Sequence, residues 1–328
     1  MGPGDVHMRC EPTHTKQSLC VLIYGVTGKV LYQLANDIRQ ALAFWYLHKI
    51  SLIVRDIALP RKANAGNPDM KRTVESRAVM SALLFTILSL LVLFGTLSAL
   101  GPDWSKFAPA TCTATHCFCE LPRVGHLMLQ PANSLSSFGY VLIGFLMVGL
   151  ARVRDTVSAF APLAMQTLGV TSIIVGLGSA LLHATLTLWG QFFDVVGMYL
   201  VGSFFLVRAL ARWRKIPDGR ATALYIGLSG MLILLLIMLP ESRRWLFAVL
   251  LIVAIIVELA FARPLRPGAH LTYYLGGLFV TALAFGIWML DQQRIICVPE
   301  SLLQGHAIWH ILGAASLWLT FCYYRSER

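Results

Sequence analysis

Residues 159–184 read AFAPLAMQTLGVTSIIVGLGSALLHA, and this stretch contains no Asp, Glu, Lys or Arg. About 20 apolar residues are enough for an α-helix to cross the roughly 30 Å hydrocarbon core of a bilayer. Because backbone polar groups in lipid must be satisfied within the protein, such a run folds as a helix. The stretch therefore predicts a membrane-spanning helix.

The same pattern recurs along the chain from residue 78. It predicts eight spans: 78–101, 131–152, 159–184, 190–211, 221–240, 244–262, 269–290 and 304–323. The chain is 57% hydrophobic and 13% charged, whereas a soluble domain contains about 25% charged residues. A single run could be a buried helix of a soluble protein, but no soluble core needs eight. The predicted fold is all-α, a polytopic transmembrane helix bundle.

The net charge of +11 follows the membrane topology and is not a nucleic-acid signal. Basic residues concentrate at alternate helix ends: Lys71, Arg72, Arg77, Arg152, Arg154, Arg208, Arg212, Arg214, Lys215, Arg220, Arg263, Arg266, Arg325 and Arg328. The positive-inside rule makes that side cytoplasmic, together with both termini. The outward-facing loops are then 102–130, 185–189, 241–243 and 291–303.

The N-terminal extension, residues 1–77, differs from the rest and carries no signal-peptide pattern. We expect a poorly ordered extension; the alternative is an interfacial amphipathic helix over residues 31–59. Met70 opens a basic start to the first span and is a second possible initiator. We expect no function in residues 1–69.

Four of the seven cysteines lie in the predicted outward loops: Cys112, Cys117, Cys119 and Cys297. An oxidising exterior permits disulfides there. A bond between Cys119 and Cys297 would tie the loop before the second span to the loop before the last. The alternative is metal binding, but no second closely spaced pair completes an all-cysteine site. The spacing alone does not decide the connectivity.

Three histidines lie in or beside the apolar spans: His183, His306 and His310. An ionisable group in lipid is costly and indicates function. The last two are four residues apart, which places both on one helix face. Topology puts all three at one membrane depth, so we predict a zinc site with an open fourth position.

Two further polar residues fall at the same depth. Ser179 lies one turn before His183, and Asp194 lies just inside the next span. Asp194 could take a proton from a water activated by zinc, and Ser179 could stabilise an oxyanion. One alternative is a set of interhelical hydrogen bonds. A haem site is another alternative, although the four-residue spacing of His306 and His310 favours a single ion.

These residues form a pattern that resembles the alkaline ceramidase family. The pattern is Ser179-x3-His183-x10-Asp194, followed by His306-x3-His310. Cys119-Glu120 and the segment from Gln130 to Ser136 look like the start of the ceramidase core, and Asp291 and Cys297 look like its last outer loop. The resemblance covers about residues 117–324. It implies that residues 131–328 form a seven-helix hydrolase core, with 78–101 as an additional helix and 102–130 as an outer Cys-containing loop.

The resemblance also implies an activity and its residues. It implies a zinc-dependent amidase acting on ceramide, with His183, His306 and His310 as ligands, Asp194 transferring protons and Ser179 at the oxyanion. It further implies the disulfide Cys119–Cys297. A calcium site of the family is reduced here to Glu120 and Asn133, because Cys117 and Gln130 stand where acidic residues are expected. We therefore do not expect calcium, which takes six to eight oxygen ligands.

The predicted protein is an integral membrane hydrolase that draws a lipid substrate from the bilayer, with its active site on the non-cytoplasmic side. Two alternatives stay open: a hydrolase of another acylated lipid, and a non-catalytic, receptor-like metal-binding protein. The membrane would be the plasma or inner membrane in a bacterium, and the endoplasmic reticulum or Golgi in a eukaryote. Nucleic acid is not an expected partner, and the sequence carries no signal for an oligomeric state.

Overall fold

The structure is a computed structural model that describes residues 68–113, 118–151, 161–264 and 268–327. Most of the predicted N-terminal extension, residues 1–67, lies outside the described residues, as does Cys117. The described part is helical, with one isolated β-bridge between Pro109 and Thr187. Eight of its segments are long and apolar enough to cross a membrane, which confirms the predicted all-α membrane bundle.

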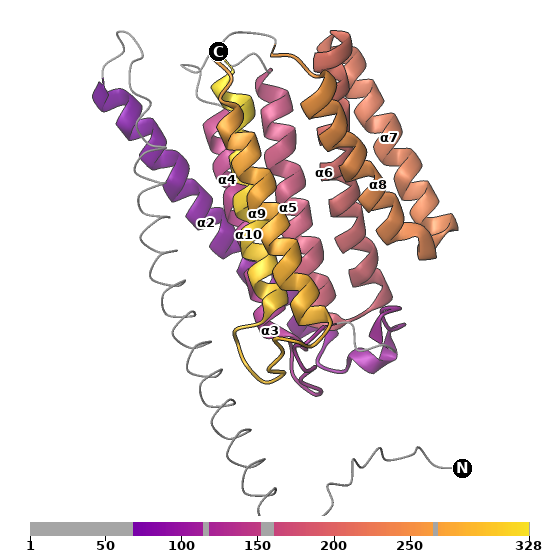
Figure 1. The fold of residues 1–328 in the computed structure, drawn as a ribbon. Coiled ribbons are helices and arrows are strands. Elements are labelled where there is room, and N and C mark those ends of the chain that lie inside the picture. The colour runs from indigo at the N-terminus through magenta and orange to yellow at the C-terminus, as the bar shows by residue number, and fades with distance from the viewer. Residues whose placement is uncertain (1–67, 114–117, 152–160, 265–267, 328) are drawn as a thin grey trace, which may run out of the picture. The chain divides into compact units, whose positions relative to one another are not determined.

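The helices follow the predicted spans closely (Figure 1). They are α2 Pro68–Leu100, α3 Pro131–Ser136, α4 Phe138–Ala151, α5 Pro162–Thr185, α6 Leu188–Arg214, α7 Asp218–Met238, α8 Arg243–Ile256, α9 Leu271–Gln292 and α10 Gly305–Ser326. Short 3-10 helices η1 (Trp104–Lys106) and η3 (Pro240–Ser242) lie in the loops, and the π-helix η4 (Val257–Phe261) extends α8.

Two helices differ from the predicted spans. Helix α2 begins at Pro68, ten residues before the predicted start of the first span. Those residues are mostly polar, and a helix can extend beyond the apolar layer because water there satisfies polar side chains. The second span is divided into α3 and α4 at Ser137. The Ser137 hydroxyl donates to the carbonyl of Asn133 at 2.9 Å, a local bond that competes with regular helix geometry.

Glycine contacts bring α4, α5 and α6 close together. A Cβ on Gly144 of α4 would lie 2.6 Å from the carbonyl oxygen of Gly169 on α5, and a Cβ on Gly169 would lie 2.7 Å from the carbonyl oxygen of Gly144. Between α5 and α6, a Cβ on Gly197 would lie 2.7 Å from the Cα of Val175. Small residues allow membrane helices to pack at backbone distance. Helix α2 packs against α4, and α10 packs against α9, α3, α4 and α5.

A buried ionic cluster joins α6, η4 and the end of α10. Arg212 on α6 pairs with Glu258 of η4, and its other amino group lies 3.0 Å from Glu327. The Tyr323 hydroxyl donates to Glu258 at 2.9 Å. All three charged side chains are at most 2% exposed. Charges at such depth are stable only when they are paired, so this cluster fixes the three elements to one another.

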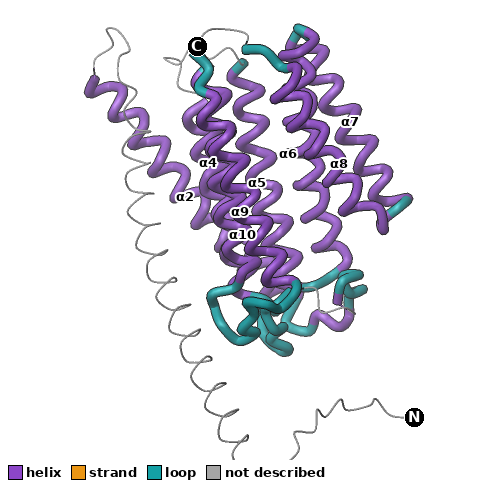
Figure 2. Tube along the Cα trace, in the orientation of Figure 1, coloured by secondary structure: helices purple, strands orange, loops and turns teal. Residues whose placement is uncertain are grey.

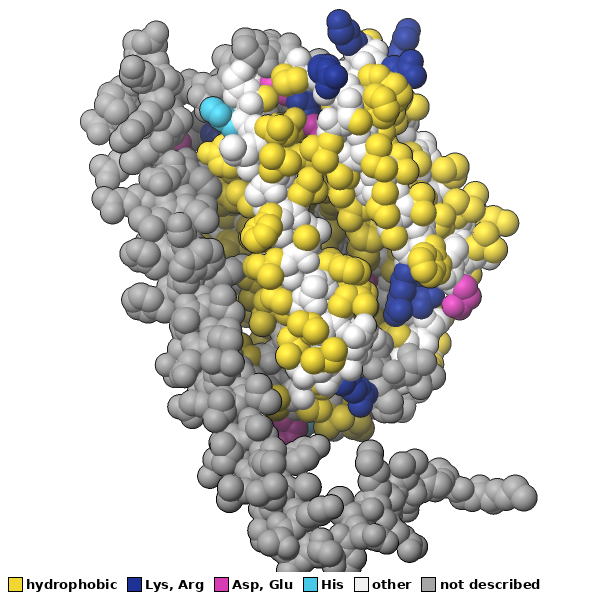
Figure 3. Space-filling model, viewed as in Figure 1, with side chains coloured by type: hydrophobic (Ala, Val, Ile, Leu, Met, Phe, Trp, Pro, Cys, Tyr) yellow, Lys and Arg dark blue, Asp and Glu magenta, His cyan; other side chains and the backbone are white. Residues whose placement is uncertain are grey.

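The loops predicted to face outward gather at one end of the bundle (Figure 2), where α5 ends and where α6 and α10 begin. Most of the visible Lys and Arg side chains lie at the opposite end (Figure 3). This agrees with the segregation of charge from which the topology was predicted. The side of the membrane that each end faces remains a prediction.

Candidate active site

Three buried histidines converge at the loop-rich end of the bundle. His183 lies in the last turn of α5, and His306 and His310 lie in the first two turns of α10. One ring nitrogen from each lies within 4.8 Å of one from each of the others. Each of the three histidines is at most 7% exposed. The predicted clustering across more than 120 residues of sequence is therefore present in the structure.

The end of α5 is held in place by the segment that precedes α3. The backbone N–H of Gln130 donates to the carbonyl of His183 at 3.0 Å, and that of Leu129 donates to the carbonyl of Ala184 at 2.9 Å. These bonds satisfy carbonyls that a helix end leaves unpaired. Leu186 then turns the chain in the left-handed conformation, with φ of 48°. The tight turn starts α6 at Leu188, two residues earlier than predicted.

Hydrogen bonds fix which nitrogen of two histidines faces the centre. The Gln130 amide nitrogen donates to the carbonyl of Glu120 at 2.7 Å, so its oxygen is the atom 2.9 Å from Nδ1 of His183. The Nδ1 atom must therefore be protonated, which leaves a lone pair on Nε2. The Nδ1 atom of His310 lies 3.0 Å from the carbonyl of Asn133 and is protonated for the same reason. Its Nε2 atom also carries a lone pair.

The donor set fits a zinc ion. The Nε2 atoms of His183 and His306 lie 3.2 Å apart. Tetrahedral zinc with Zn–N bonds of 2.0–2.1 Å separates its ligand atoms by about 3.3 Å. The Nδ1 atom of His306 is buried and has no hydrogen-bond partner among the described residues. Imidazoles with free lone pairs in an apolar environment are suited to a cation of this kind.

Ser179 lies beside His310, and Asp194 lies next to Ser179. The Ser179 hydroxyl lies 3.2 Å from Nε2 of His310 and also interacts with the side chain of Asp194. Gly178 allows this contact, since a Cβ there would lie 2.5 Å from the carbonyl oxygen of Phe193 and 2.9 Å from the backbone nitrogen of Asp194. Asp194 is partly exposed, whereas the histidines are buried.

Phe118 covers the histidines and was missed in the sequence analysis. Its ring centroid lies 4.5 Å from that of His183 and 4.6 Å from that of His306. Its neighbour Cys119 forms a disulfide with Cys297, the pairing that the resemblance implied. A lone aromatic residue in a loop gives little sequence signal of such a contact, and the available one is the position of Phe118 beside Cys119.

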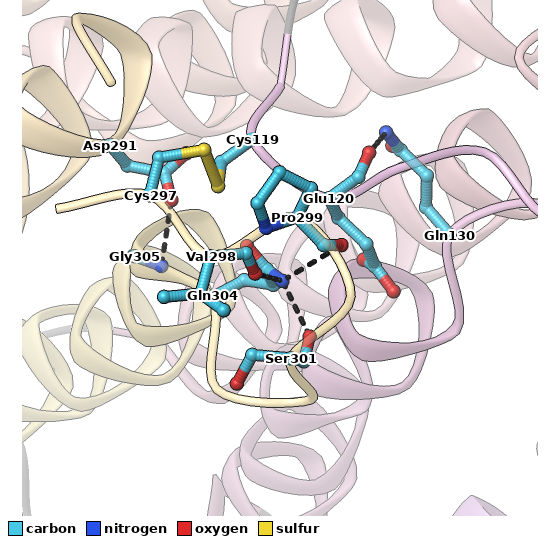
Figure 4. Close-up of a disulfide and its surroundings, with 10 residues drawn as sticks. All are labelled: Cys119, Glu120, Gln130, Asp291, Cys297, Val298, Pro299, Ser301, Gln304 and Gly305. Carbon is cyan, nitrogen blue, oxygen red and sulfur yellow. Dashed lines mark hydrogen bonds between the residues drawn. A yellow bond between two sulfur atoms is a disulfide. The ribbon is translucent and has the colours of Figure 1, made fainter. Parts of the chain in front are cut away.

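Asp291 fixes the start of α10 and thereby the position of His306. It lies at the end of α9 and accepts a hydrogen bond from the backbone N–H of Gly305 at 2.8 Å (Figure 4). It also interacts with the backbone N–H groups of His306 and Cys119. The Gln304 amide donates to the carbonyls of Val298 and Ser301, at 3.0 and 2.5 Å. A carboxylate at a helix N-terminus satisfies free N–H groups and complements the helix dipole.

Glu120 and Asn133 also support the histidines. The two carboxylate oxygens of Glu120 accept the N–H groups of Ala132 and Asn133, both at 2.8 Å, at the start of α3. Burial raises the pKa of Glu120, and these two hydrogen bonds oppose that rise. Asn133 contributes its backbone carbonyl to His310, while its side-chain amide is buried without a partner among the described residues. Both carboxylate oxygens of Glu120 thus accept hydrogen bonds from the protein backbone.

Comparison with known proteins agrees with this arrangement. The family model described as Ceramidase matches residues 110–327, about two thirds of the 328 residues. The chain belongs to the ceramidase family. A comparison with curated proteins finds no match. The matched region of this ceramidase-family protein begins after α2 and η1 and contains every residue of the candidate site. It is an integral, multi-pass membrane protein of a family of amide-bond hydrolases.

Proposed function

We propose that this protein is a zinc-dependent amidase that hydrolyses the N-acyl bond of ceramide or a ceramide-like lipid. The observation that carries the proposal is the convergence of His183, His306 and His310 beside the Ser179–Asp194 pair. Hydrolysis breaks the amide C–N bond and adds the elements of water, which yields a fatty acid and a free amine. This reaction needs an activated water, a polarised carbonyl and a route for a proton to the amine.

The three histidines would hold the zinc ion through His183 Nε2, His310 Nε2 and a ring nitrogen of His306. A bound zinc would act as a Lewis acid and lower the pKa of water to about 7. Gln130 and the carbonyl of Asn133 orient two of the rings through their Nδ1 atoms. Such outer hydrogen bonds fix the tautomer of a ligating histidine and raise its basicity.

Asp194 and Ser179 carry the proton and charge chemistry in this proposal. The carboxylate of Asp194 accepts the proton of the attacking water and returns it to the leaving amine. The Ser179 hydroxyl stabilises the developing oxyanion as a hydrogen-bond donor. An ion-binding protein without turnover needs neither group, so the position of the Ser179–Asp194 pair beside His310 favours an enzyme over a receptor.

The apolar surface next to Asp194 suits a substrate from the bilayer. Phe118 covers His183 and His306, while Phe193, the neighbour of Asp194 on α6, is 47% exposed. An amide carried on two apolar chains would approach along this apolar surface. The segregation of basic residues supports a non-cytoplasmic position for the site.

Lipid analysis of cells tests the substrate. Cells that express the protein are compared with cells that express Asp194→Asn, which keeps the fold and the metal ligands. We expect ceramide or a ceramide-like N-acyl lipid to decrease, and its free amine to rise, only with the unmodified protein. A change confined to ester lipids would favour the alternative of a hydrolase that acts on another acylated lipid. Identical lipid profiles with both proteins would contradict the proposed activity.

A further inference from the structure

A groove lies at the end of the bundle opposite to the histidines, where α6 ends and α7 begins. Its volume is about 720 Å³. The lining residues are Arg214, Lys215, Ile216, Pro217, Arg220, Ala223, Leu224, Gly227 and Leu228. The proposed reaction uses none of them.

The lining has a charged end and, along α7, an apolar strip that includes Leu224 and Gly227 and that we call the lane. Arg220, Leu224 and Gly227 follow one another along α7 at helical spacing, so they lie on one face of that helix. A side chain at Gly227 would meet no atom within 4 Å of its Cβ, which shows that the lane is open there. At 1.5 Å per residue, the lane runs roughly 10–12 Å from Arg220 into the membrane span.

The cations of the groove are not neutralised by the protein. Arg214 lies over the ring of Trp213 at 4.1 Å. Lys215 and Arg220 have no ion-pair partner among the described residues, and the nearby carboxylate of Asp218 is bound to Arg208 at 3.0 Å. Three positive side chains therefore face one end of an apolar lane. The matching ligand has a negative headgroup attached to an acyl chain.

We propose that this groove binds one anionic phospholipid, with the headgroup phosphate at Arg214, Lys215 and Arg220 and an acyl chain along α7. Basic pockets between membrane helices bind anionic headgroups, and each cation near the surface contributes about 1 kcal/mol, a factor of about five in affinity. The site is distinct from the proposed catalytic site, which lies at the other end of α6. The lipid would hold the junction of α6 and α7, and α6 carries Asp194.

Native mass spectrometry of the purified full chain in a neutral detergent tests this site. The probes are phosphatidylglycerol and phosphatidylcholine with the same acyl chains. We expect one phosphatidylglycerol per chain and much weaker binding of phosphatidylcholine. The combined variant Arg214→Gln, Lys215→Gln, Arg220→Gln should weaken phosphatidylglycerol binding roughly 100-fold. Arg263→Gln removes a charge at the same end outside the groove and should have little effect.

A second variant tests the lane without changing charge. Gly227→Leu should weaken phosphatidylglycerol binding by filling the lane, whereas Gly286→Leu, at an equally open position on α9 outside the groove, should not. Inorganic phosphate should not compete. Equal binding of both phospholipids, or unchanged binding in the charge variant, would overturn the proposal. If inorganic phosphate competes and Gly227→Leu does not weaken phosphatidylglycerol binding, the groove is a simple anion site. That result would also overturn the proposal. Retained thermal stability of each variant shows that it is folded.

Discussion

The side-chain oxygen of Gln130 lies 2.9 Å from Nδ1 of His183, and the nitrogen of the same amide donates to the carbonyl of Glu120 at 2.7 Å. Gln130 thus links the segment after the disulfide to a candidate metal ligand. The amide has one orientation only, because its nitrogen is committed to a carbonyl. That orientation sets the tautomer of His183 and leaves its Nε2 atom free for a metal.

We predict that Gln130→Met weakens zinc binding by roughly 10- to 100-fold, the usual cost of losing an outer hydrogen bond to a ligating histidine. Competition with a chelator of known affinity measures the change. Gln130→Glu keeps an acceptor oxygen for His183 and should lose much less affinity. Equal zinc affinity in the Met variant and the unmodified protein would show that Gln130 does not orient the ligand.

We predict about one zinc per chain, measured by elemental analysis of detergent-purified protein. His310→Ala should lose zinc and activity together, because a site with three protein ligands cannot spare one. Ser136→Ala is a suitable control, since Ser136 contacts Nδ1 of His310 at 2.9 Å but Asn133 still accepts from the same nitrogen. Stoichiometric iron with a haem spectrum would contradict the zinc assignment.

Asp194→Asn should keep zinc and lose turnover by about 10²- to 10⁴-fold, the range that general acid–base groups contribute. The substitution preserves shape and removes the proton acceptor. Release of fatty acid from ceramide, with zinc measured in the same sample, gives both quantities. If the variant hydrolyses lipid at the unmodified rate, Asp194 has no proton-transfer role. If zinc is lost as well, Asp194 orients or binds the metal.

Gly178→Ala should reduce activity strongly and destabilise the protein by about 1–3 kcal/mol, the usual cost of overpacking. Its Cβ would meet the carbonyl oxygen of Phe193 at 2.5 Å and push α6, with Asp194, away from Ser179. Gly230→Ala has nothing within 4 Å of the new Cβ and is the matched control. Hydrolysis rates and thermal midpoints compare the two. Similar rates in both variants would show that the α5–α6 contact does not position Asp194.

Non-reducing peptide mapping should recover Cys119 linked to Cys297. Replacing Cys297 by Ser should lower stability by about 2–4 kcal/mol, because the bond closes a long loop in the unfolded chain. The thermal midpoint should fall in Cys297→Ser and in unmodified protein treated with reductant. Cys322 is buried, and Cys322→Ser serves as the control for thiol removal. Two free thiols at Cys119 and Cys297 in freshly purified protein would contradict the disulfide.

The sequence by itself determined the eight membrane-length helices, because a bilayer imposes one length and one composition on every span. It also placed His183, His306 and His310 at a common depth, since depth follows from position along each span. The four-residue spacing of His306 and His310 fixed their shared helix face without any tertiary information. Helix ends were less certain, as α2 and the break at Ser137 show, because polar residues and local side-chain bonds decide them.

Only the tertiary structure decided which groups support and enclose the histidines. Gln130, Asp291 and Phe118 act through contacts between loops and helix ends, and no periodic pattern marks such contacts in a sequence. The approach of Asp194 to Ser179 likewise depends on backbone contact at Gly178. Depth along a helix is a one-dimensional property that a sequence contains. Rotation, closest approach and hydrogen-bond direction between helices arise only when all the helices pack together.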